Sequence, residues 1–158
     1  MPKIMVQKFG GTSVGTPERI KAVAKRIIAT AQKFDHVLAV VSAMGDSTDD
    51  LIKLAKQVSQ DPNPREYDAL VSTGENVSAA LVAMAIIDQG GQAISLTGPQ
   101  ACIMTEKTYS KAKILDIDTK RILKELSKNK IIIITGFQGI NENMDVTTIG
   151  RGGSDTSA

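Results

Sequence analysis

The sequence predicts an α/β fold built on a mostly parallel sheet. Runs of β-branched and aliphatic residues at 4–8, 37–41 and 131–135 are typical of buried parallel strands. Between the first two runs, Thr16 offers an N-cap hydroxyl and Pro17 occupies the first helical position, so a helix connects them. A strand, a helix and a second strand in this order form a βαβ unit, which places the two strands parallel in one sheet.

The helices follow from apolar spacing and capping residues. Residues 47–50 cap a second helix that runs to about residue 60, where the prolines in 61–64 break it. A third helix is expected from about 65 to 89. Residues 77–87 of this helix are apolar on nearly every face, so we expect it to be buried in the domain or against a partner subunit. The core-facing stripe of the first helix consists of Ile20, Val23, Ala24, Ile27, Ile28 and Ala31.

The rest of the chain predicts shorter elements. We expect strands near 93–96 and 113–115, a loop through Tyr109 between them, and a helix capped by Asp118. Residues 151–158 resemble a glycine-rich turn followed by the first turn of a helix. Because a helical nucleus without further turns is unfavourable, we expect residues 1–158 to be one N-terminal portion of a longer domain, with no second domain in this chain.

Composition excludes several classes of protein. The net charge of the 158 residues is +2, and basic and acidic residues alternate, so no basic stripe indicates a nucleic-acid partner. The longest apolar run is shorter than the roughly 20 residues that span a bilayer, so we expect no membrane association. The single cysteine, Cys102, excludes an internal disulfide and a cysteine-rich metal site. With no signal peptide in the sequence, the cytoplasm is the expected location.

Two glycine-rich turns indicate anion binding. The first strand brings Lys8 to its carboxyl end and opens into Gly10 and Gly11, where backbone N–H groups and an ammonium can converge on phosphate. The spacing fits neither a dinucleotide fingerprint nor a Walker loop. An alternative is a turn that needs positive φ and binds nothing. The second turn carries Arg151, whose planar fork matches a carboxylate or phosphate, and Asp155.

Five motifs together resemble the aspartokinase branch of the amino acid kinase superfamily. The likeness runs from about residue 3 to the last residue. It implies a three-layer α/β/α sandwich with a mostly parallel sheet, truncated before the nucleotide-binding half. The pair of glycine turns favours this branch over the superfamily's glutamate, acetylglutamate and UMP kinases. The motifs are residues 6–14, 41–45 with Thr48 and Asp49, 72–75, 136–139 and 148–156.

The resemblance implies transfer of the γ-phosphoryl group of ATP to the β-carboxylate of L-aspartate. The product is 4-phospho-L-aspartate, in the first step of lysine, threonine and methionine biosynthesis. A carboxylate is already a nucleophile, so catalysis needs positioning and charge neutralisation rather than a general base. His36, the only histidine, is interpreted as a surface residue. Mg²⁺ is expected with ATP, held by phosphate oxygens and water rather than by a protein site. A homo-oligomer, or assembly with the remaining C-terminal portion, is expected.

The resemblance also assigns roles at the phosphate. Lys8 would neutralise the transferring phosphoryl group, and Asp155 would orient Lys8. Phe9, Gly10 and Gly11, with Ser42, would complete the phosphate site. Lys8 has an alternative role as a solvated strand-end lysine, although its same-face neighbours in the first strand are apolar.

For the amino acid, the resemblance gives Glu75 the ammonium and Arg151 the α-carboxylate. Glu75 could instead only complement the helix dipole, and Phe137, expected in the pocket, could be a core residue. Ser42 and Thr48 could equally be cap or turn residues. A competing function is a non-catalytic half-domain that binds aspartate or a partner chain without turnover. The expected substrate site comprises Thr48, Glu75, Phe137, Arg151, Gly152, Gly153 and Ser154.

Overall fold

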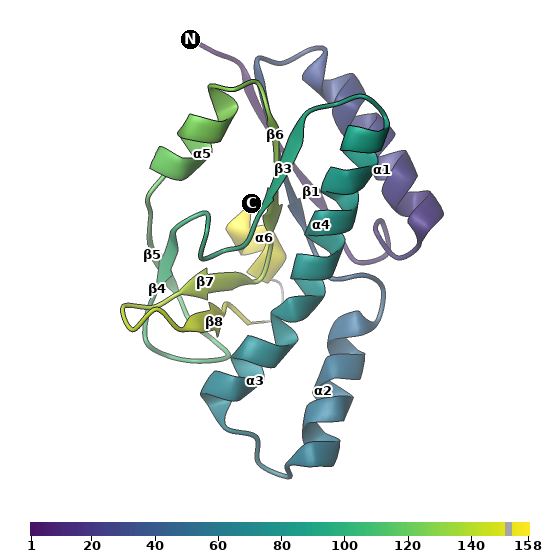
Figure 1. The fold of residues 1–158 in the computed structure, drawn as a ribbon. Helices are drawn as coiled ribbons and strands as arrows, with labels where there is room; N and C mark the ends of the chain where they lie inside the picture. Colours follow the sequence, from purple (N-terminus) through teal and green to yellow (C-terminus); the bar gives the residue numbers. More distant parts are fainter. Residues whose placement is uncertain (151–152) are drawn as a thin grey trace.

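A computed structural model describes residues 1–150 and 153–158. Its central sheet contains four parallel strands, so the predicted α/β class is confirmed (Figure 1). Because the strands share one direction, their carboxyl ends meet at one edge, which is where open α/β sheets bind ligands. In spatial order the strands are β1 (Ile4–Phe9), β2 (His36–Val41), β6 (Ile131–Thr135) and β3 (Ala93–Leu96).

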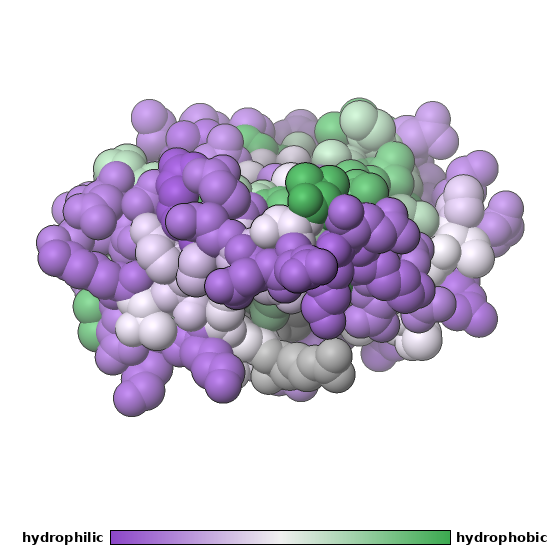
Figure 2. All heavy atoms as spheres, turned by 90° about the horizontal axis from the view of Figure 1, so that it is seen from below, coloured by the Kyte–Doolittle hydropathy of each residue, from purple (hydrophilic) through white to green (hydrophobic). Residues whose placement is uncertain are grey.

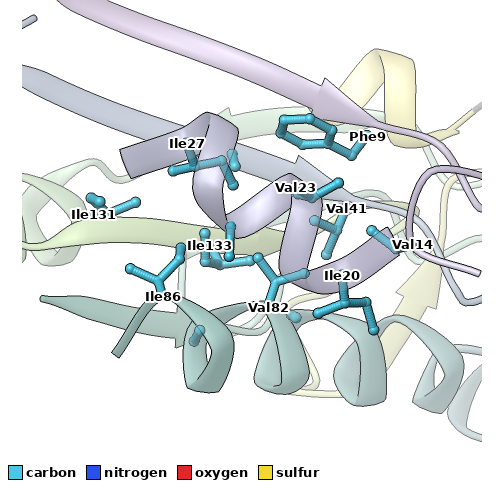
Figure 3. Close-up of a cluster of buried hydrophobic side chains, with 14 of the residues drawn as sticks. Phe9, Val14, Ile20, Val23, Ile27, Val41, Val82, Ile86, Ile131 and Ile133 are labelled. Atoms are coloured by element: carbon cyan, nitrogen blue, oxygen red, sulfur yellow. The ribbon is translucent and has the colours of Figure 1, made fainter. Parts of the chain in front are cut away.

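Two helices cover one face of this sheet. They are α1 (Pro17–Ala31) and α4 (Thr73–Asp88), and their apolar side chains meet those of the strands in the larger core cluster (Figure 3). The predicted N-cap is present, because the Thr16 hydroxyl accepts a hydrogen bond from the N–H of Arg19 at 3.3 Å. The labelled members of the cluster are Phe9, Val14, Ile20, Val23, Ile27, Val41, Val82, Ile86, Ile131 and Ile133.

The opposite face carries α5 (Lys120–Leu126) and a second, mixed sheet. Ile122 and Leu126 of α5 pack on Leu38 and Val40 of β2, which completes the three-layer arrangement. Strands β4, β7 and β8 were not predicted, because three residues are too few to show an alternating pattern. The order of the second sheet is β5 (Ile114–Ile117), β4 (Ile103–Thr105), β7 (Gln138–Ile140) and β8 (Val146–Thr148).

Three boundaries differ from the prediction. The helix expected over residues 65–89 is divided at Ser72 into α3 (Pro64–Val71) and α4. Helix α2 (Ser47–Val58) has Asp46 as its N-cap residue without a side-chain bond, so the predicted cap at 47–50 is wrong. Thr119 is the N-cap residue of α5, while the carboxylate of Asp118 accepts a hydrogen bond from the N–H of Lys120 at 3.0 Å.

Strand β1 is one of the two edge strands of the central sheet in the described structure. Its side chains Ile4 and Val6 are 50% and 46% exposed, and Lys8 lies on the same face. The expectation of a buried strand is therefore wrong for this face of β1, which pairs only with β2 within the described residues.

Helix α4 buries one side in the core and exposes the other. Four apolar residues of α4 are exposed: Val77, Leu81, Met84 and Ile87. The expected burial within the domain is therefore found on only one side of the helix. From the end of the molecule where α2 and α3 lie, Figure 2 shows hydrophobic residues gathered on one side of a mostly hydrophilic surface. The 25-residue segment Pro64–Asp88 could cross a membrane by length and composition alone, but half of its apolar stretch is buried, as in a core helix.

Candidate active site

A cavity of about 530 Å³ lies at the carboxyl edge of the central sheet. The loops after β1, β2 and β6 contribute to it, together with α2, the start of α4 and the end of β8. Predicted site residues and unpredicted ones meet there. Its lining comprises Gly11, Ser42, Ala43, Gly45, Thr48, Asp49, Ile52, Lys56, Tyr67, Glu75, Ser110, Phe137, Thr148 and Gly150.

Glu75 is the buried carboxylate of this cavity. Only 3% of the residue is exposed. Its Oε1 accepts a hydrogen bond from the N–H of Ala43 at 3.3 Å, whereas its Oε2 is buried and has no hydrogen-bond partner among the described residues. Burial raises the pKa of Glu75 to about 7, and the hydrogen bonds from its own backbone and from Ala43 oppose that rise.

Close packing fixes the first turn of α4 beneath the cavity. A Cβ at Gly74 would lie 2.9 Å from the Cβ of Ala43, so only glycine allows the helix to approach the β2 loop this closely. The Ser78 hydroxyl donates to the Ser42 carbonyl at 2.6 Å. At the break between α3 and α4, the side-chain amide of Gln138 donates to the Ser72 carbonyl at 2.9 Å. Strand β7 therefore stabilises the turn that carries Glu75.

Lys8 and Asp155 form an ion pair between the first strand and the last helix. The Nζ of Lys8 lies 2.6 Å from Oδ1 of Asp155, which belongs to α6 (Gly153–Ser157). The Lys8 side chain is 35% exposed, so the ammonium remains accessible to an anion beside the glycine turn. The structure thus brings together the two residues predicted for catalysis.

The turn at Gly10 and Gly11 needs glycine because the backbone of the β2 loop packs closely against it, and not because of unusual dihedral angles. Neither Gly10 nor Gly11 has positive φ. A Cβ at Gly11 would lie 2.8 Å from the Ala43 carbonyl oxygen, and that glycine's carbonyl accepts a hydrogen bond from the N–H of Gly45 at 3.0 Å. The alternative of a turn that needs positive φ is therefore wrong.

Phe137 adopts a left-handed conformation with φ of 69° at the turn between β6 and β7. It lines the cavity, and its N–H donates to the Ser157 hydroxyl at 3.2 Å. Thr48 and Ser42 also line the cavity, whereas Phe9 is part of the core under α1. Sequence reasoning thus located some of the lining residues but not the strain at Phe137, which has no signature in the residue type.

Part of the predicted substrate site lies outside the described structure. Arg151 and Gly152 fall in the gap between the two described segments. Gly153 and Ser154 begin α6, but the structure does not describe their side chains. Gly150, with φ of 91°, leads directly into this segment from the cavity wall.

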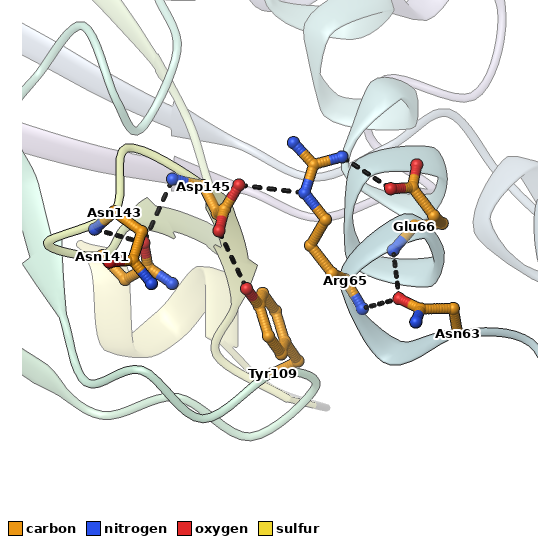
Figure 4. A network of polar contacts seen from close by, with 7 residues as sticks. All are labelled: Asn63, Arg65, Glu66, Tyr109, Asn141, Asn143 and Asp145. Atoms are coloured by element: carbon orange, nitrogen blue, oxygen red, sulfur yellow. Dashed lines mark hydrogen bonds and ion pairs between the residues drawn. The ribbon is translucent and has the colours of Figure 1, made fainter.

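Sequence reasoning missed the polar residues that hold α3 against the second sheet. Asp68 is fully buried, and Arg65, Tyr109 and Asp145 form a more exposed network beside it (Figure 4). The Nε of Arg65 and the hydroxyl of Tyr109 both donate to the Asp145 carboxylate at 2.9 Å, and they hold the pKa of that carboxyl below its usual range. The available signal was Asp68 itself, an acid followed directly by the apolar residues Ala69, Leu70 and Val71.

Comparison with known proteins identifies the family. The model of the amino acid kinase family matches residues 3–158.

The chain belongs to the amino acid kinase family.

Similar relatives of this family member are aspartokinases. The aspartokinase of Geobacillus stearothermophilus is 56% identical over 155 residues, covering 98% of this chain and 38% of the relative. Aspartokinase 2 of Bacillus subtilis is 52% identical with the same coverage of both chains. The amino acid kinase chain described here therefore spans less than two fifths of the length of these relatives.

Solved structures support the same fold. The aspartate kinase of Synechocystis superposes with a TM-score of 0.81 at 50% identity, covering 99% of this chain and 25% of that one. Escherichia coli aspartokinase III, crystallised with aspartate and ADP, superposes with a TM-score of 0.84 over 97% of this chain and 44% of its own, but at 22% identity it supports the fold alone. The predicted family and architecture of this amino acid kinase are confirmed.

The described residues of this amino acid kinase offer few acidic side chains that could hold Mg²⁺. Within residues 1–150 and 153–158, no three His, Cys, Asp or Glu side chains come close enough to hold a metal ion. The cavity carries Asp49 and Glu75 as its acidic lining residues. This donor set does not fit a resident Mg²⁺ site.

Proposed function

We propose that this chain is the amino-acid-binding portion of an aspartate kinase. The enzyme would transfer the γ-phosphoryl group of ATP to the β-carboxylate of L-aspartate, giving 4-phospho-L-aspartate. The observation that carries the proposal is Glu75, a carboxylate that lines the cavity and whose buried Oε2 has no hydrogen-bond partner among the described residues. An α-ammonium group would pair with this carboxylate, and the aspartokinase relatives indicate the substrate.

The remaining pocket residues would orient the substrate. Thr48 and Phe137 line the cavity beside Glu75, and Arg151 with residues 152–154 would bind the α-carboxylate by a bidentate fork. The two ends common to all α-amino acids would then be held, and the depth of the cavity would select the length of the side chain. A carboxylate nucleophile placed in this way needs no general base.

At the phosphoryl group, Lys8 would neutralise the charge that develops during transfer. Asp155 holds the ammonium at 2.6 Å and would keep it charged and aimed. Gly10 and Gly11 would donate backbone N–H groups to phosphate oxygens, with Ser42 beside them. Mg²⁺ would arrive with ATP and supply charge neutralisation from the phosphate oxygens and water rather than from protein ligands.

The exposed surface of the chain indicates which partners to expect. The exposed apolar side of α4 supports assembly with another subunit or with the C-terminal portion of the kinase. We place the enzyme in the cytoplasm, in keeping with a single unpaired cysteine. The first step of lysine, threonine and methionine biosynthesis is the reaction we assign to the complete protein.

A second candidate is a half-domain that binds aspartate without turnover. The observation in its favour is that the chain spans 38% of the length of its relative from Geobacillus. Positioning of the nucleotide supplies much of the rate enhancement in phosphoryl transfer. A chain without the adenine-binding part of the domain would therefore lose turnover while it still binds aspartate. We expect little or no activity from the isolated 158 residues.

Two measurements test the proposal. Calorimetric titration of L-aspartate into the chain should show binding, whereas succinate, which has both carboxylates but no ammonium, should not bind. A hydroxamate assay should detect ATP-dependent acyl phosphate with the complete kinase and not with the isolated chain. Equal binding of succinate and aspartate would contradict the role of Glu75, and robust turnover by the isolated chain would contradict the need for the remaining portion.

A further inference from the structure

Asp68 is a buried carboxylate whose hydrogen-bonding capacity is filled. The residue is 0% exposed. Its Oδ2 accepts from the N–H groups of Ser110 and Thr148, both at 2.8 Å. Its Oδ1 accepts from the two hydroxyl groups of the same residues, at 3.1 Å and 3.0 Å. Four donors from two residues thus converge on one side chain, and this compensates the cost of burying it.

These bonds join three segments that are far apart in the sequence. Asp68 lies on α3, Ser110 lies in the loop between β4 and β5, and Thr148 ends β8. Ser110 adopts φ of 64°, an unfavourable conformation for a residue other than glycine, and the Asp68 carboxylate binds both its N–H and its hydroxyl. The N–H of Ala112 donates to the Thr148 carbonyl at 3.0 Å, so the loop and the strand are also bonded to each other.

The same two residues line the amino-acid cavity. Ser110 and Thr148 are both cavity residues, and Thr148 is followed by Gly150, which leads into the segment assigned to the α-carboxylate. Glu75, assigned to the ammonium, lies seven residues after Asp68, in the first turn of α4, which follows α3 directly. Two consecutive helices therefore carry the residue assigned to the ammonium and the residue that anchors Ser110 and Thr148.

We propose that Asp68 is a positioning residue for aspartate binding: its four hydrogen bonds hold Ser110 and Thr148 in place in the wall of the cavity that Glu75 also lines. The proposal rests on the proposed function and adds a residue that touches no substrate. Loss of the hydrogen bonds of Asp68 would displace Ser110 and Thr148 from their positions in the cavity wall. The affinity for the nucleotide would be unaffected, because the hydrogen bonds of Asp68 in the described structure go to Ser110 and Thr148 and not to Lys8 or the glycine turn.

The test is a comparison of Asp68→Asn with Glu125→Gln in the complete kinase. Asparagine retains the shape but replaces one acceptor oxygen with a donor, so two of the four bonds lose their acceptor. Glu125 of α5 is a matched control, since it is also buried, at 4% exposure, and pairs with Lys128 and Lys130 in the turn after α5, none of which lines the cavity. We expect the KM for aspartate to rise at least tenfold in Asp68→Asn, with the KM for ATP within twofold of wild type.

If Asp68 serves only to stabilise the fold, Asp68→Asn and Glu125→Gln should both lower the melting temperature. The KM for aspartate of the folded protein should then be unchanged in both variants. That result would overturn the proposal. Ser110→Ala removes one donor, leaves Asp68 in place, and should raise the KM for aspartate about threefold if Asp68→Asn fails to fold; an unchanged KM would count against the proposal. Failure of the wild-type chain to bind aspartate in the calorimeter would instead contradict the proposed function itself.

Discussion

The N–H of Ala43 donates to one carboxylate oxygen of Glu75 at 3.3 Å and leaves the other oxygen of that buried group without a partner. The contact joins the loop after β2 to the first turn of α4. It binds one oxygen of the carboxylate but does not supply a counter-charge, and burial raises the pKa of Glu75 to about 7. The raised pKa has consequences that can be measured.

Glu75→Gln should stabilise the protein at alkaline pH. A folded pKa of about 7 lies above the ordinary value of 4.5, so the folded state binds the proton more tightly than the unfolded state. Stability associated with Glu75 is therefore complete below pH 4.5 and decreases as the pH rises through 7. Glutamine avoids the cost of ionisation, and the gain at pH 8 should be about 3 kcal/mol. Urea denaturation of both proteins at pH 5 and pH 8 measures the difference, and an equal effect at the two pH values would contradict it.

Aspartate affinity should fall as the pH is lowered below 7. Only the ionised carboxylate of Glu75 attracts an ammonium group, so the apparent Kd should rise about tenfold for each pH unit below its pKa. Asp49 and Lys56 are the other charged residues that line the cavity. Titration calorimetry at pH 5.5, 6.5 and 8.0 gives the slope. A Kd that is constant over this range would exclude Glu75 as the ammonium ligand.

Lys8→Ala in the complete kinase should lower kcat by on the order of 100-fold or more, with little change in the KM for aspartate. The reason is that charge on the transferring phosphoryl group grows toward the transition state, where an oriented cation has its largest effect. Asp155→Asn should have a smaller effect in the same direction, because the lysine stays in place without its 2.6 Å partner. Steady-state kinetics separate the two parameters, and a KM defect at normal kcat would assign Lys8 to ground-state binding.

Gly74→Ala should destabilise the protein by about 1–2 kcal/mol and weaken aspartate binding. The new methyl group would lie 2.9 Å from the Cβ of Ala43, and the overpacking outweighs the better helix propensity of alanine. The shift would also separate Glu75 from the Ala43 N–H. The double variant with Ala43→Gly removes the clash and serves as the control. Thermal unfolding should show recovery in the double variant; a further loss of stability would indicate that close packing is not the cause.

The sequence by itself determined the central architecture and part of the pocket. The parallel strands, the capped helix α1 and the glycine turns follow from local patterns, because β-branched runs, N-cap residues and prolines act over a few residues. The same patterns, with the family resemblance, located Lys8, Glu75 and Asp155. The second sheet escaped prediction, since its short strands are stabilised by contacts with distant partners and not by their own composition.

Tertiary structure decided which polar groups are satisfied. Asp68 and Glu75 are acids on two consecutive helices, and nothing in their local sequence distinguishes a carboxylate with four donors from one with a single donor. The difference arises because Ser110 and Thr148 come from elements 42 and 80 residues away from Asp68. Hydrogen-bond partners of buried groups are set by the meeting of distant segments, and so the positioning of this site could be found only in the folded chain.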